Sequence, residues 1–182
     1  MEISSIRGGY SNAAKQLNKF IEVGYQDYAQ YRSDPSKEAS SQLSPYFHSG
    51  QISTHEVFDK ISELESWSPE SINPKMVGRR EGWWGSSDNF ESFMDELITW
   101  RELGYHTCVR RANYNQYSSL PEWAIKTLHE HSSDEREYIY SLDELTYSQT
   151  HDEIWNAAQN QLRTQGVCLL YTSDAADDLL CV

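Results

Sequence analysis

Apolar side chains recur at three- and four-residue spacings through most of this chain, which is the pattern of amphipathic helices. No segment shows the sustained alternation of apolar and polar residues that is typical of a β-strand. One long helix is predicted from about Ala13 to Tyr31, because Pro35 follows shortly after it. Its expected apolar face consists of Leu17, Phe20, Ile21, Gly24 and Tyr28. The periodicity therefore predicts an all-α fold.

Three pairs of residues have the spacing of a capping box, in which a Ser or Thr begins a helix and an acidic side chain in the first turn bonds back to it. They are Ser53 with Glu56, Ser141 with Glu144, and Thr150 with Glu153. The first of these helices is expected to bury Val57, Phe58, Ile61 and Leu64. The last is expected to carry Trp155, Ala158 and Leu162 and to end at Gly166.

Between these helices, the segment from Ser66 to Ser87 contains two prolines and three glycines, so we expect it to form a long loop. Asp88 with Glu91 then begins the next predicted helix. Its expected core stripe consists of Phe90, Phe93, Leu97, Trp100 and Gly104. Pro121 is expected to begin a further helix that runs through Ala124 and Leu128.

The stretch SSQLSPYFHSGQIS, from Ser40 to Ser53, places serines in front of one short helical turn. Ser44 is expected to cap this turn through its hydroxyl, with Pro45 at the first helical position, where a missing N–H has no cost. The backbone donors of such a helix start, together with the hydroxyls of Ser40 and Ser41, would form an uncharged cradle for a phosphate or another anion. An ordinary capped turn is the alternative interpretation, and this stretch alone does not decide between them.

The composition is that of one globular domain, since the chain has 182 residues of which 38% are hydrophobic. No apolar run approaches the ~20 residues that a membrane-spanning helix needs. The three cysteines, Cys108, Cys168 and Cys181, have neither metal-ligand spacing nor an even count. This favours a reducing, cytoplasmic location without a metal site over a disulfide scaffold.

The net charge of −13 argues against loose binding to a nucleic-acid backbone, which depends on Lys and Arg releasing counterions. Two local basic patches are the exceptions, from Val77 to Trp84 and from Arg101 to Arg111. Arginines beside aromatic rings suit stacking and phosphate contacts, whereas a solvated helix face is the alternative.

The end of the chain differs from the rest. From Cys168 onward it has no Lys or Arg, and the run CLLYTSDAADD resembles the conceptual translation of a sequencing-library transposon adaptor. We therefore expect residues 167–182 to be adaptor-derived and exclude them from the fold reasoning. A native acidic tail helix is the alternative.

Five motifs follow one another along the chain. They are YAQYRSDP (Tyr28 to Pro35), SSQLSPYFHSGQIS, FMDELITWREL (Phe93 to Leu103), LPEWAIKTLHEH (Leu120 to His131) and THDEIWNAAQNQL (Thr150 to Leu162). Their order resembles that in DNA photolyases. The chain most resembles the class II cyclobutane pyrimidine dimer photolyases, over about Gly8 to Gly166. This resemblance implies that residues 1–166 are part of a helical FAD-binding domain of the photolyase/cryptochrome type. It also implies an antenna domain before this region and further helices after it, so we expect a fragment of a larger, monomeric enzyme.

The resemblance implies a set of flavin-binding residues as well. In the family, a tyrosine and the serine-rich motif that follows it hold the phosphates and ribityl chain of FAD. The corresponding residues here are Tyr28, Ser40, Ser41, Gln42, Leu43 and Ser44. Uncharged hydroxyls and amides can hold a pyrophosphate without burying cations that would need partners of their own.

Glu96 and Trp100 correspond to residues that face the damaged DNA in photolyases. The two are four apart and are therefore expected on one side of a helix. The resemblance implies that Glu96, in its neutral form, donates a hydrogen bond to the charge that builds on the dimer, and that Trp100 stacks on the displaced pyrimidines. Without the family, Trp100 would be interpreted as core and Glu96 as a solvated acid. Arg101 is expected to contact flavin or DNA phosphate, and many class II members have arginine in place of Trp100.

Trp155, in the HDEIW motif, matches one tryptophan of the relay that reduces the flavin under light in class II photolyases. A purely structural indole packed among helices is the alternative. Asn156 and Gln159 are candidate polar contacts on the same helix.

The resemblance thus implies light-driven repair of cyclobutane pyrimidine dimers, with DNA that contains these lesions and FAD as partners and no membrane. A cryptochrome-like blue-light photoreceptor is the alternative. The chain as given is expected to be inactive, because half of the flavin pocket would lie outside it.

Overall fold

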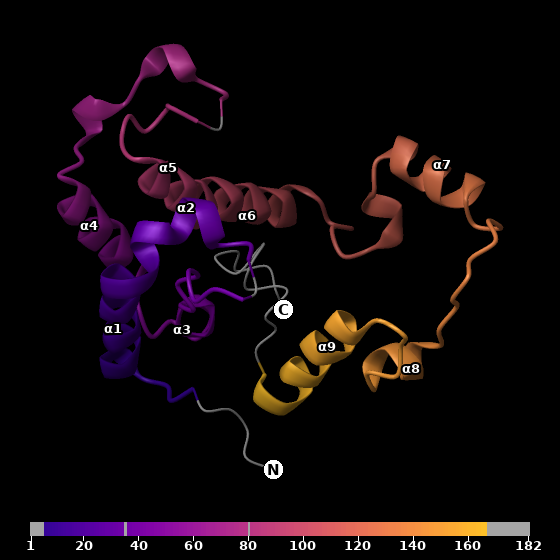
Figure 1. Ribbon diagram of the computed structural model, residues 1–182. Helices are drawn as coiled ribbons and strands as arrows, with labels where there is room; N and C mark the ends of the chain where they lie inside the picture. The colour runs from indigo at the N-terminus through magenta and orange to yellow at the C-terminus, as the bar shows by residue number, and fades with distance from the viewer. Residues whose placement is uncertain (1–5, 35, 80, 167–182) are drawn as a thin grey trace.

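The computed structural model describes residues 6–34, 36–79 and 81–166. Over these residues the secondary structure is helical and no strand is present, which confirms the all-α fold. Figure 1 shows that the N-terminal helices group together, whereas the three C-terminal helices lie to one side of that group. Within the described residues, no helix combines the length and the apolar character that crossing a bilayer requires. The adaptor-like residues 167–182 lie outside the described part of the chain.

The first helical run extends from residue 10 to residue 31 without a break. It consists of α1 (Tyr10–Lys19), the π-helical turn η1 (Phe20–Gly24), the 3₁₀ turn η2 (Tyr25–Asp27) and α2 (Tyr28–Tyr31). The predicted face is confirmed, since Leu17, Phe20, Gly24 and Tyr28 are buried and Ile21 is partly buried. Ala13 and Tyr25 are buried in addition. The wider π turn changes the angular register of the helix, so a single 3.6-residue period does not predict Tyr25.

Gly24 allows the next segment of the chain to approach this helix. A Cβ at this position would lie 3.0 Å from the carbonyl oxygen of Glu38 and 3.4 Å from that of Ala39. A larger side chain would therefore displace the backbone that leads into the serine-rich stretch.

The helix α3 (Ser44–His48) comes directly after that stretch, and α4 (Thr54–Glu65) follows. The expected capping box of α4 is wrong. Ser53 does cap the helix, but its hydroxyl accepts from the backbone N–H of His55, and Glu56 instead accepts a hydrogen bond from the hydroxyl of Tyr10 at 2.8 Å. Val57 and Ile61 are buried and Phe58 is partly buried, as predicted, whereas Leu64 is 45% exposed and was wrongly placed in the core.

Two short 3₁₀ turns, η3 (Pro69–Ser71) and η4 (Pro74–Met76), are the regular elements within the described part of the predicted loop. Both ends of this loop are fastened to the helical core. Glu65 accepts hydrogen bonds from the hydroxyls of Tyr25 at 2.8 Å and Ser87 at 2.7 Å. The Trp67 indole donates to the Trp84 carbonyl oxygen at 2.7 Å. These contacts bring the start and the end of the loop together.

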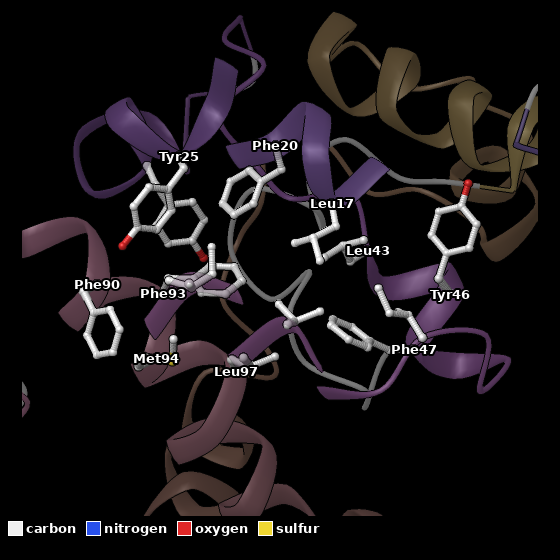
Figure 2. Packing of buried hydrophobic residues seen from close by; sticks show 14 of the residues in the cluster. Leu17, Phe20, Tyr25, Leu43, Tyr46, Phe47, Phe90, Phe93, Met94 and Leu97 are labelled. Carbon is white, nitrogen blue, oxygen red and sulfur yellow. The ribbon is translucent and has the colours of Figure 1, made fainter. Parts of the chain in front are cut away.

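A second continuous helical run comprises α5 (Asp88–Met94), the π-helical turn η5 (Asp95–Trp100) and α6 (Arg101–Arg110). Ser87, and not Asp88, caps its start by accepting from the backbone N–H of Phe90. Figure 2 shows side chains of this run packed against those of the first run and of the α3 region. Phe90, Phe93, Leu97 and Gly104 are buried as predicted.

The C-terminal elements are η6 (Tyr117–Ser119), α7 (Glu122–Glu130), α8 (Leu142–Thr146) and α9 (Glu153–Gln165). None of these four elements contains a buried residue in the described part of the chain. The capping box of Ser141 with Glu144 is confirmed, as is the end of α9 at Gly166, which has a left-handed φ of 71°. The capping box of Thr150 with Glu153 is wrong, because Asp152 accepts from the backbone of Ile154 and Trp155 and caps α9.

Candidate functional site

Tyr28, the first residue of α2, is the aromatic anchor of the candidate site. Its side chain is almost completely buried, and its ring lies edge-to-face against Phe20 at 5.7 Å and Phe93 at 5.2 Å between centroids. Edge-to-face pairs of this kind add to the free energy gained by burial alone. Tyr28 therefore fixes the end of the first helical run against the second.

Arg32, one turn after Tyr28, forms an ion pair with Glu96 of η5 through its Nη1 atom and the Oε1 atom of the carboxylate. The two side chains are 16% and 8% exposed. The guanidinium also lies over the Tyr28 ring, 5.8 Å from its centroid. Burial opposes the charge on Arg32, but hydrogen bonding to Glu96 and the neighbouring Tyr28 outweigh it and raise the pKa of Arg32 above its ordinary value.

Glu96 is therefore a buried, paired acid, and its interpretation as a solvated acid is wrong. A guanidinium in direct contact favours the ionised carboxylate over the neutral one. The role of Glu96 as a neutral hydrogen-bond donor stays a prediction, and with the contacts seen here it would require a change at Arg32. Arg32 itself was not singled out from the sequence, although it lies four residues after Tyr28 and so on the same face of the helix.

Trp100 ends the π turn η5, and its placement in the core was wrong, because its side chain is 46% exposed. Its indole Nε1 donates a hydrogen bond to Oδ2 of Asp95 at 3.2 Å. Asp95 is itself buried, and the two residues are five positions apart, which is the spacing that a π turn brings into line. The hydrogen-bond partner of the Trp100 indole is thus Asp95, and the placement of Glu96 and Trp100 on one side of the helix stays a prediction.

The serine-rich stretch lies against the first helical run. The Gln16 side chain donates to the Ser41 carbonyl oxygen at 2.9 Å, and the buried Ser41 hydroxyl accepts from the backbone N–H of Leu43 at 3.3 Å. Leu43 is completely buried, Ser40 is half-buried, and Gln42 is exposed with a left-handed φ of 55°. The serine-rich stretch thus directly follows Glu38 and Ala39, the two residues whose backbone lies close to Gly24.

Ser44 begins α3 but does not cap it, so that prediction is wrong. Leu43 occupies the N-cap position, and no side chain of the described residues caps the helix. The Ser44 hydroxyl is instead buried and has no hydrogen-bond partner within the described part of the chain. Buried polar atoms are normally paired, and a bound water or ligand would satisfy this hydroxyl.

Arg101 has a second such atom, the buried Nε of its guanidinium, which also lacks a partner among residues 6–34, 36–79 and 81–166. Its Nη1 contacts a carboxylate oxygen of Glu102 at 3.0 Å, and the group lies over the Tyr105 ring, 5.2 Å from its centroid. A hydroxyl and a guanidinium N–H are both donors that suit a phosphate or a flavin carbonyl. Two of the residues implied for FAD thus carry orphaned donors whose chemistry fits the cofactor, and Ser62, Glu91 and Ser148 carry orphaned polar atoms elsewhere in the described residues.

Trp155 lies on α9 and is not brought together with the residues above. Its indole Nε1 donates to the Leu145 carbonyl oxygen of α8 at 3.4 Å, and the ring is 38% exposed. The side-chain amide of Asn156 donates a hydrogen bond to the Thr150 carbonyl oxygen at 2.7 Å and so holds the turn before α9. Gln159 is half-buried. Figure 1 shows α8 and α9 beside one another and apart from the α5–α6 run. The relay role of Trp155 stays a prediction.

The geometry so far defines a helical domain in which an aromatic anchor, a buried ion pair and a serine-rich turn with one orphaned hydroxyl lie on adjoining elements. No family model matches the chain. Comparison with curated proteins gives clear relatives. One is a deoxyribodipyrimidine photo-lyase of Methanothermobacter thermautotrophicus, 37% identical over 166 residues, which cover 91% of this chain and 32% of the relative. Another is a deoxyribodipyrimidine photo-lyase of Potorous tridactylus, 31% identical over 165 residues, which cover 91% of this chain and 28% of the relative.

A third relative is Cryptochrome-2 of Arabidopsis thaliana, 48% identical over 50 residues, or 28% of this chain and 8% of the relative. The chain belongs to the photolyase/cryptochrome family. It spans about a third of the length of the photolyase relatives.

Proposed function

We propose that this chain is part of a DNA photolyase that repairs cyclobutane pyrimidine dimers by electron transfer from reduced FAD under blue light. The observation that carries the proposal is the 37% identity to a deoxyribodipyrimidine photo-lyase over nearly all of the chain outside the adaptor-like residues. Residues 1–166 would then form part of the helical flavin-binding domain.

Tyr28, Ser40, Ser41, Gln42, Leu43, Ser44 and Arg101 are the residues proposed to hold FAD. The chemistry that bound, reduced FAD supplies is donation of one electron to the dimer under light. The orphaned Ser44 hydroxyl and Arg101 Nε support the assignment, because each is a buried donor that a bound phosphate or carbonyl oxygen would satisfy. The hydrogen bond from Gln16 to the Ser41 carbonyl oxygen holds this backbone in place before any ligand arrives.

Glu96 and Trp100, the second and the last residue of η5, are proposed to act on the lesion. The ion pair with the Arg32 guanidinium holds the Glu96 carboxylate in one orientation. Arg32 can keep or release its hydrogen bond to Glu96 as negative charge develops on the lesion. Trp100 offers an exposed indole face on which a pyrimidine displaced from the DNA duplex can stack. Removal of the dimer from the base stack costs roughly a few kcal/mol, and weak pairing at the lesion lowers that cost.

The experiment uses the full-length, flavin-loaded protein that carries this sequence and an oligonucleotide with a single thymine dimer. We expect the dimer to be split under blue light and to remain intact in darkness. Glu96→Gln and Glu96→Ala should lower the yield per absorbed photon while the flavin stays bound, and Glu122→Ala on the exposed face of α7 is the control. Undiminished splitting in both Glu96 variants would exclude the proposed role of Glu96.

A cryptochrome-like photoreceptor is the second candidate function, and the 50-residue match to Cryptochrome-2 of Arabidopsis thaliana supports it. The same assay separates the two. A protein that binds FAD and responds to blue light, but leaves every dimer intact, would be assigned to the photoreceptor class. A protein that binds no flavin at all would contradict both.

A further inference from the structure

The indole of Trp100 is hydrogen-bonded to a buried acid of its own helix. Asp95 and Trp100 are the first and last residues of η5, and the Nε1–H of Trp100 donates to Oδ2 of Asp95 at 3.2 Å. Asp95 is 8% exposed, whereas Trp100 is 46% exposed. A large aromatic ring at the surface thus has its polar edge fixed to a carboxylate within the core.

The π turn is the reason that the two side chains meet. In a regular α-helix, residues five positions apart differ by about 140° in direction around the axis, so their side chains diverge. A π turn closes its hydrogen bonds between positions i and i+5 and brings these two residues into line. Single π turns occur frequently at functional sites, and this one carries Glu96 and Trp100, which we place at the lesion, together with Asp95.

A free surface indole would sample several orientations, since both of its side-chain torsions are unrestrained by packing. The hydrogen bond to Asp95 removes much of that freedom before any ligand binds. A ring that is already oriented loses less entropy when a base stacks on it, and preorganisation of this kind raises affinity. The bond also satisfies the indole N–H, so the ring can present its apolar face without leaving a polar atom unpaired.

We propose that Asp95 is a positioning residue, which orients the Trp100 indole as a stacking platform for a displaced pyrimidine base. This inference rests on the proposed function and adds a residue to it. The ligand is a nucleobase with an exposed π face, and Asp95 acts on it through Trp100 alone.

The test is a double-mutant cycle on binding, carried out in darkness with the full-length, flavin-loaded protein. The variants are Asp95→Ala, Trp100→Phe and the pair, and the measurement is the dissociation constant for a thymine-dimer oligonucleotide by fluorescence anisotropy. The phenylalanine variant retains a stacking ring but has no N–H for Asp95. We expect Asp95→Ala to weaken binding about fivefold when Trp100 is present and to have little effect when it is combined with Trp100→Phe, which is the coupling that a direct contact gives.

Asp95→Asn is the conservative variant, because its amide oxygen can still accept the indole hydrogen bond, and it should restore most of the affinity. Asp59→Ala, at an exposed position of α4, is the matched control and should leave binding unchanged. Flavin content and the thermal midpoint are measured for each variant, so that unfolding is separated from a local effect.

A structural role that does not involve the ring gives a different result. If Asp95→Ala weakens binding equally with and without the Trp100→Phe substitution, the proposal is overturned. A second measurement covers the case in which Asp95→Ala fails to fold. In the unsubstituted protein with ¹⁵N-labelled tryptophan, the Trp100 indole proton should exchange slowly with solvent for so exposed a ring, and rapid exchange would overturn the proposal.

Failure of the proposed repair function and failure of the inference about Asp95 give different binding results. A parent protein that binds dimer-containing and undamaged oligonucleotides equally would contradict the repair function itself. A parent that prefers the lesion, and loses that preference in Trp100→Ala but not in Asp95→Ala, would contradict only the inference about Asp95.

Discussion

Arg32 and Glu96, which are 64 positions apart in the sequence, form a buried ion pair that joins the two continuous helical runs of the domain. The pair lies beside Tyr28, whose ring contacts Phe20 of the first run and Phe93 of the second. An ionic contact and an aromatic cluster thus hold the same junction. The proposed lesion-facing acid is therefore also a structural residue.

Removal of one partner of this pair should be costly. We expect Arg32→Met to lower the free energy of unfolding by about 3 kcal/mol, because it leaves a buried carboxylate without its counter-charge. The double variant Arg32→Met with Glu96→Gln should recover much of that loss, since no charge then stays buried. Urea denaturation of the three proteins measures both effects, and equal stability of the single and double variants would contradict this account.

Gly24→Ala should shift the backbone that leads into the serine-rich stretch by a few tenths of an ångström away from the first helical run. The added Cβ would lie 3.0 Å from the Glu38 carbonyl oxygen, so the backbone of that segment must move. We expect a stability loss of about 1–3 kcal/mol and weaker flavin binding. Val23→Ala, on the exposed side of the same turn, is the control that should leave both properties nearly unchanged.

The Tyr25 hydroxyl predicts a pH dependence of stability. Burial and the hydrogen bond to Glu65 raise the pKa of Tyr25 above its ordinary value of 10.0. The folded protein therefore keeps a proton that the unfolded chain releases, and this contribution to stability is full below about pH 10 and decreases above it. Urea denaturation between about pH 9 and pH 11 should show a steeper decline for the unsubstituted protein than for Tyr25→Phe. Parallel declines would mean that Tyr25 is not the group responsible.

Ser44→Ala tests the orphaned hydroxyl directly. If FAD provides its missing partner, loss of the hydroxyl should weaken flavin binding about fivefold, since one hydrogen bond in a buried site contributes about 1 kcal/mol. The stability of the flavin-free protein should stay the same or rise slightly, because a buried unpaired group is removed. Ser49→Ala, at the exposed end of α3, is the control, and isothermal titration with FAD gives the constants. Equal affinity of the Ser44 and Ser49 variants would remove Ser44 from the flavin site.

Helical periodicity was sufficient to predict the class of the fold and about half of its buried hydrophobic residues, whereas Tyr46 and Phe47 of α3 and Trp84 of the loop were not predicted. Leu17, Phe20 and Tyr28 are buried as a 3.6-residue repeat predicts, although the run changes to a π turn at Phe20 and to a 3₁₀ turn at Tyr25. The repeat failed at Trp100, where η5 widens the helix and turns this residue out to solvent. Nothing in the local pattern of apolar residues marks a π turn, since the pattern assumes one period throughout.

The contacts of the candidate site were harder to predict than its residues. Arg32 and Glu96 meet through the tertiary packing of two helices, and sequence spacing carries no information about such a pair. Asp152 replaced Thr150 as the cap of α9 for a more local reason. Both are good capping residues two positions apart, and only the backbone conformation selects between them.

The loop between α4 and α5 has a property that follows from how its ends are tied. Glu65 accepts a hydrogen bond from Ser87, and the Trp67 indole donates one to the Trp84 carbonyl oxygen, so the two ends of the loop are held close together. Its tip is open to solvent, as at Val77, which is 72% exposed. Insertions and deletions near that tip should therefore change the free energy of unfolding only slightly, because the entropic cost of closing a loop depends weakly on its length. This makes the tip the natural place to attach a label or an affinity tag without disturbing the junction at Tyr28.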